Sequence, residues 1–142
     1  MLKTLMSCSI AALLSLAALP AFAHGDSSLA EAPPEAPYQK VSDLVPLPEF
    51  IPGLGQLFVD PATLPAGPFL AYDREGALVS TIYMIPIEDL NPDTSFDALA
   101  SPGGSVDHVS IHYNAGHPGV EMPHAHIILW HVPADEQARL SQ

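Results

Sequence analysis

The N-terminus decides how much of the chain is left to fold, because the first 23 residues have the pattern of a cleavable secretory signal. Lys3 is the only early charge, and residues 5–19 are almost entirely apolar or small. Pro20 breaks this run, and an Ala-Phe-Ala cleavage box follows at 21–23. The apolar stretch is shorter than the roughly 20 residues that span a bilayer. We therefore expect a signal peptide at residues 1–23, no stable membrane anchor after cleavage, and a periplasmic or secreted mature protein.

The composition of the mature chain limits its chemistry. Removal of the signal leaves 119 residues, the size of one small domain. The only cysteine, Cys8, leaves with the signal, so neither a disulfide nor a thiolate metal site can form. Three basic residues remain against 16 acidic ones, which gives a net charge of −13 with histidine neutral. This charge repels phosphate backbones and argues against nucleic acid as a partner, whereas cations and basic partners fit it.

Prolines and turn residues divide the mature chain into short segments. Residues 24–52 form a Pro-rich acidic N-terminal segment, which we expect to be partly disordered. Residues 53–142 are predicted to form a β-rich domain. Its strands are predicted at 56–59, 69–72, 77–85, 106–113 and 124–132, and short helices at 93–100 and 134–140. The predicted fold class is mostly β, an antiparallel sandwich or small barrel with one or two short helices.

Histidines are concentrated near the C-terminus, where six of the seven fall within the 24 residues 108–131. Side chains alternate between the two faces of a strand. His108 and His112 therefore share one face of the strand at 106–113. The opposite face is predicted to be core and consists of Val109, Ile111 and Tyr113.

The last predicted strand carries a second histidine pair, His124 and His126, on one face. One antiparallel register sets His112 opposite His126, with His124 diagonal to it. Directly paired Cβ atoms lie about 5 Å apart, so these imidazoles could converge on one ion. A slip of one residue would send them to opposite faces. Because neutral imidazole is a good ligand for transition metals, His112, His124 and His126 are the predicted ligands, with Zn or Cu as the expected ion.

Four neighbouring side chains extend this candidate site. His117 lies in the loop between the two strands and could cover the ion, whereas His108 is further from that loop. Asp107 and Glu121 are the nearest carboxylates for a fourth ligand, an outer hydrogen bond or a general base. Three histidines with an open position would be the arrangement of a catalytic zinc.

Two further histidines stand apart from the predicted site. Cleavage after Ala23 would make His24 the N-terminal residue, whose amine and imidazole could chelate copper. The alternative is that His24 is the first residue of a flexible tail. His131 points to the opposite face from His124 and His126, or lies at the strand end.

Two segments carry a resemblance to known proteins. Residues 79–86 read Val-Ser-Thr-Ile-Tyr-Met-Ile-Pro, and the loop Gly-His-Pro-Gly-Val at 116–120 is followed by Pro123-His124. They resemble an uncharacterised family of small secreted bacterial proteins with a Tyr-Met strand, a G-H-x-P-G-V loop and a P-H histidine strand. The resemblance would cover residues 53–132. It implies a β-rich fold that is compatible with a symmetric homo-oligomer, and it implies no established enzymatic activity.

The resemblance transfers only part of the family's histidine pattern. The family spacing is P-H-x-x-x-H, and here Ile128 occupies the second position. Gln56 also stands where a histidine is expected. Only His117 and His124 therefore carry over directly. A weaker likeness is to the cupin H-x-H opening, but residues 127–130 lack the glutamate that a cupin would place there.

Three functions remain open from the sequence. The first is a periplasmic protein that binds or handles a transition metal through the histidine hairpin. The second is a non-catalytic structural or stress-related envelope protein without metal, in which the histidines stabilise the hairpin or an oligomer interface. The third is a small metal-dependent enzyme. A non-enzymatic protein is favoured, because the sequence shows no Gly-x-Ser-x-Gly elbow and no nucleophilic cysteine, and it identifies no substrate.

Overall fold

The computed structural model describes residues 27–141. The predicted signal peptide at 1–23 and the candidate copper ligand His24 lie outside the described residues. Both therefore stay predictions. Within residues 27–141, no helix is long and apolar enough to cross a membrane.

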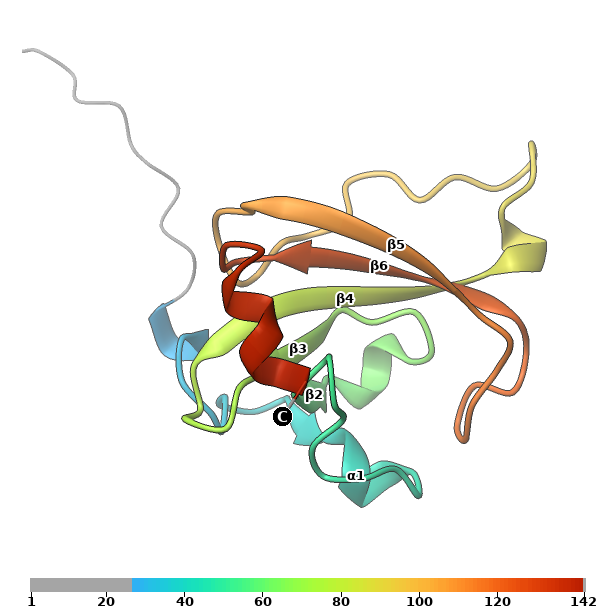
Figure 1. The fold of residues 1–142 in the computed structure, drawn as a ribbon. Coiled ribbons are helices and arrows are strands. Elements are labelled where there is room, and N and C mark those ends of the chain that lie inside the picture. Colours follow the sequence, from blue (N-terminus) through green and yellow to red (C-terminus); the bar gives the residue numbers. More distant parts are fainter. Residues whose placement is uncertain (1–26, 142) are drawn as a thin grey trace, which may run out of the picture.

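The strands form one antiparallel sheet in the order β1-β2-β3-β4-β6-β5 (Figure 1). They are β1 (Gln39–Lys40), β2 (Gln56–Val59), β3 (Phe69–Tyr72), β4 (Leu78–Pro86), β5 (His108–Asn114) and β6 (His124–Trp130). The predicted mostly-β antiparallel class is confirmed. Within residues 27–141 the six strands lie in a single sheet with β1 and β5 at its two edges, instead of two facing sheets or a closed barrel.

The long strand β4 is the centre of the sheet and is buried from Val79 to Pro86. It pairs with β3 on one side and β6 on the other. The β3–β4 turn follows the prediction, since Asp73 Oδ1 accepts hydrogen bonds from the backbone N–H groups of Glu75 and Ala77. Gly76 in this turn has a φ of 85°, which glycine adopts without steric cost.

One face of the sheet carries the main hydrophobic core, and the short helix α1 (Val41–Leu44) belongs to the layer that covers it (Figure 1). Val41 is buried in this core, and Val45 and Leu47 pack against it. Residues 27–52 thus contribute β1, α1 and core contacts to the same unit as residues 53–141. Their prolines lie in the turns between these elements, where a missing N–H group is tolerated.

The helical segments are short. Besides α1, the described chain has the 3-10 helices η1 (Ser27–Leu29), η2 (Pro61–Thr63), η3 (Ile87–Asp89) and η4 (Glu136–Ser141). The helix expected at 134–140 is found as η4, in which Leu140 is buried. The helix predicted at 93–100 is wrong, because this segment forms turns and irregular backbone. Its large apolar residues are Phe96, which is only partly buried, and Leu99, which is exposed, so a helix there would bury little apolar surface.

The face of β5 that was predicted to be core is exposed. Val109, Ile111 and Tyr113 are 51%, 69% and 68% accessible to solvent. Alternation shows correctly which residues share a face, but it does not show which face a second layer covers. In the structure the covering layer with α1 lies over the other face of the sheet, where the histidines point.

Candidate metal centre

The pairing of β5 with β6 places the histidines of both strands on the covered face. His112 lies directly opposite His126, and Asn114 lies opposite His124. This is the register that the sequence allowed. On its other side β6 pairs with β4, where Met84 faces His126. His124 and His126 therefore project from the same face as the core residues Ile128 and Trp130.

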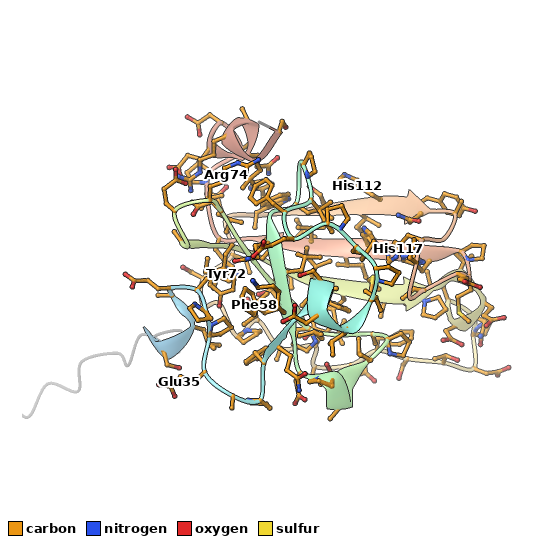
Figure 2. All side chains as sticks on the ribbon, turned by 90° about the horizontal axis from the view of Figure 1, so that it is seen from below. Glu35, Phe58, Tyr72, Arg74, His112 and His117 are labelled. Atoms are coloured by element: carbon orange, nitrogen blue, oxygen red, sulfur yellow. The ribbon has the colours of Figure 1, made fainter. Side chains whose placement is uncertain are left out.

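A tight turn in the β5–β6 loop brings a third histidine, His117, to this face (Figure 2). His117 and Val120 form an antiparallel bridge, in which each backbone N–H donates to the other residue's carbonyl at 3.0 Å. Pro118 and Gly119 occupy the turn, and Gly119 has a φ of 91°, as a type II turn requires. A Cβ at Gly119 would lie 2.9 Å from Val45 Cγ1, so the turn packs closely against the segment after α1.

The side chains of His117, His124 and His126 form a compact cluster, which we call the histidine triad. Each offers one ring nitrogen, and the three nitrogens lie within 4.8 Å of one another. The ring of His117 meets that of His124 edge to face, with centroids 4.9 Å apart. Among residues 27–141, this group contains three histidines and no carboxylate. The arrangement could hold a metal ion.

Backbone carbonyls fix the tautomer of two members of the triad. His124 Nδ1 lies 2.8 Å from the carbonyl of Met122, and His117 Nδ1 lies 3.0 Å from the carbonyl of Pro118. A carbonyl only accepts, so each Nδ1–H donates and each neutral ring keeps a lone pair on Nε2. Metal-binding histidines are oriented in this way by the hydrogen bond of the second nitrogen.

His126 supplies the third nitrogen. Its Nε2 lies 3.0 Å from Nε2 of His124. Two nitrogens on a tetrahedral Zn²⁺ ion stand about 3.3 Å apart, so this spacing is close to that of two ligands on one ion. His124 is completely buried and His126 is 9% exposed. Burial, followed by repulsion from His124, His117 and His112, lowers the pKa of His126 to about 4, so the ring is neutral over the physiological pH range.

The other predicted site residues lie elsewhere. His112 is exposed on the edge strand and is not a member of the triad, although it pairs with His126. Glu121 is exposed, and Asp107 bonds His108 at 2.8 Å between Oδ1 and Nδ1. The structure thus brings together His124 and His126 with the loop histidine. The signal that could have selected His117 is the Pro-Gly pair after it, which predicts a turn that folds the loop back.

The fold and the triad define a small antiparallel β protein with a candidate metal site. Comparison with known proteins finds a solved structure with a similar fold. Residues 73–113 match the model of the TTHB210-like family, described as hypothetical protein TTHB210. Hypothetical protein TTHB210 from Thermus thermophilus, whose crystal structure is known, is 44% identical in sequence to this chain. The match covers 68% of this chain and 94% of that chain, and the two structures superpose with a TM-score of 0.59. The chain belongs to the TTHB210-like family.

The family assignment confirms the resemblance to a small family of hypothetical proteins. Because these relatives are described only as hypothetical, any function has to be inferred from the site itself. No curated protein matched the chain. The segment that matches the family model ends at residue 113, before the histidine triad. Metal binding is therefore inferred from the geometry of the triad.

Proposed function

We propose that this protein is exported and binds one transition-metal ion, Zn or Cu, through His117, His124 and His126. The observation that carries the proposal is the convergence of three ring nitrogens, one from each histidine, within 4.8 Å. Backbone carbonyls also bond Nδ1 of His117 and of His124 and orient these two rings. The ligands are all imidazoles, which suit Zn and Cu, and the absence of a thiolate from the mature sequence is consistent with this choice. The signal pattern at residues 1–23 supports export.

Burial of His124 and His126 favours metal binding over simple hydrogen bonding. His126 Nε2–H donates to His124 Nε2, and no carboxylate belongs to the described group. An ion would replace this single contact by three coordination bonds, with the His126 proton moved to Nδ1. Because His126 stays neutral down to a pH of about 4, protons compete little with metal at this ligand.

The test is the metal content of untagged protein, purified from the periplasm without chelators. We expect about one equivalent of a single transition metal in the wild type. His117→Ala removes a ligand and should weaken metal binding by roughly 100-fold or more. His112→Ala is the matched control, because His112 is an exposed histidine that faces His126 outside the triad.

The two variants distinguish the ligand set seen in the structure, which includes His117, from the set predicted from the strands, which includes His112 instead. Loss of metal in His112→Ala with retention in His117→Ala would contradict the triad and restore His112 as the third ligand. No metal in any protein, and none taken up on titration, would leave the structural or stress-related envelope protein as the function. Equal, full metal content in both variants would also contradict the proposal.

A further inference from the structure

The triad borders an apolar cavity of about 240 Å³. Its wall includes Ile51 and Leu54 from the segment after α1 and Phe69, Ile82 and Met84 from the sheet. The polar residues on this wall are Asn114, His117 and His126. Two of the three proposed ligands thus face both the ion position and the cavity.

The charge of a loaded triad determines what would occupy this cavity. Three neutral imidazoles leave a divalent ion with its full charge, and no carboxylate joins the described group. A charge beside an apolar wall needs a counter-ion, because burying an unpaired charge is costly. Three protein ligands also leave the fourth tetrahedral position open. An anionic oxygen at that position would meet both requirements.

The size and lining of the cavity limit the rest of the ligand. A dry cavity of about 150 Å³ lined by aliphatic residues accommodates benzene in another protein. A cavity of about 240 Å³ therefore accommodates a body of roughly seven to nine carbon atoms. A second hollow of about 80 Å³ shares Val41, Leu47, Phe69, Met84 and His117 with it, so a longer chain would have some additional room.

We propose that the cavity beside the histidine triad binds a small organic carboxylate, with its apolar body in the cavity and its carboxylate on the metal ion. This inference rests on the proposed function, because the metal supplies the positive charge. Ile51 and Leu54 are only partly buried, so the wall that they form reaches solvent. The ligand class is a medium-chain fatty acid or an arylalkanoate of similar length.

Octanoate is the probe, measured by calorimetry on zinc-loaded and metal-free protein after the zinc content of each sample has been determined. We expect the zinc-loaded protein to bind octanoate at least ten times more tightly than the metal-free protein. Octanoate has four more methylenes than butyrate and should bind roughly 200-fold more tightly, since each buried methylene contributes roughly fourfold. Octanol should bind more weakly than octanoate, because it brings no charge to the ion.

Two variants test the place of binding. Leu54→Trp fills the cavity from a partly buried position and should weaken octanoate binding at least tenfold with zinc content unchanged. Leu90→Trp adds the same ring at a position that is 53% exposed and outside the cavity wall. This variant should change neither octanoate binding nor zinc content.

The outcomes distinguish this inference from the proposed function. A protein that binds zinc but not octanoate, or that binds octanoate equally without zinc, would overturn the inference and leave the metal site standing. A protein that takes up no zinc would overturn both, and the zinc analysis would show this before octanoate is added.

Discussion

Histidines at the two ends of the β5–β6 pair differ in what their ring nitrogens contact. In the triad, His117 and His124 use Nδ1 on a backbone carbonyl and keep Nε2 as an acceptor. At the other end, His131 Nδ1 bonds the carbonyl of Ser105 and its Nε2 bonds Thr81 Oγ1. His108 likewise contacts Asp107 with Nδ1 and the amide of Gln137 with Nε2.

Residue type alone therefore does not identify a metal ligand. Both ring nitrogens of His108 and of His131 bond groups that are not histidines, so a metal ion would have to break one of these hydrogen bonds and leave its partner unpaired. In the triad, His124 and His126 are buried and their Nε2 atoms contact each other, so an ion could replace this contact. Substitutions at both ends of the pair, and the pH dependence of stability, test that difference.

The largest effect is expected at His124, whose ring is completely buried. His124→Ala leaves a cavity and removes the partner of the Met122 carbonyl, so the metal-free protein should lose about 3 kcal/mol of unfolding free energy. The exposed His112 is the comparison, and His112→Ala should change stability by less than about 0.5 kcal/mol. Urea denaturation measures both. Equal losses would show that the ring of His124 does not belong to the core.

A smaller effect is expected from pH on the metal-free protein. The folded-state pKa of His126 is about 4, below the value of 6.5 expected in the unfolded chain. Between these values the unfolded chain takes up a proton that the folded chain does not, so stability falls as pH falls from 6.5 to 4. Between pH 6.5 and pH 4 the loss from this group should be about 2.5 kcal/mol.

Urea denaturation at several pH values measures this dependence, with His126→Gln as the control because glutamine does not titrate. The difference in unfolding free energy between the wild type and this variant should shrink on acidification. A difference that stays constant from pH 6.5 to pH 4 would contradict the buried, neutral state of His126. At higher pH this group contributes no pH dependence.

Local patterns predicted the strands but not the layer that covers them. Alternation and turn residues placed β2 at its observed bounds and predicted the β3–β4 hairpin. They allowed the observed pairing of His112 with His126 as one of the possible registers. The same alternation could not choose which face of β5 is buried, because that depends on where α1 and its loop pack. For the same reason residues 24–52 were predicted only as a Pro-rich, partly disordered segment, and the position of Val41 in the core could not be foreseen.

The candidate site could be predicted only as far as the strands determine it. His124 and His126 share a face by strand geometry, so they were identified from spacing alone. The third position depends on the turn at Pro118-Gly119 and on its packing against Val45, which is a contact between segments far apart in the sequence. Strand spacing favoured His112, whereas the turn brings His117 into the triad.

The smallest effect is expected at His131, at the end of the pair opposite the triad. Because Nδ1 of this ring donates to Ser105, its Nε2 accepts from the buried hydroxyl of Thr81. His131→Ala leaves that hydroxyl without this partner and should reduce the unfolding free energy by about 1 kcal/mol, with metal content unchanged. The added change Thr81→Val removes the unpaired hydroxyl, so the double variant should be no less stable than His131→Ala alone. Loss of metal in His131→Ala would contradict the division of the histidines into one binding group and one hydrogen-bonded group.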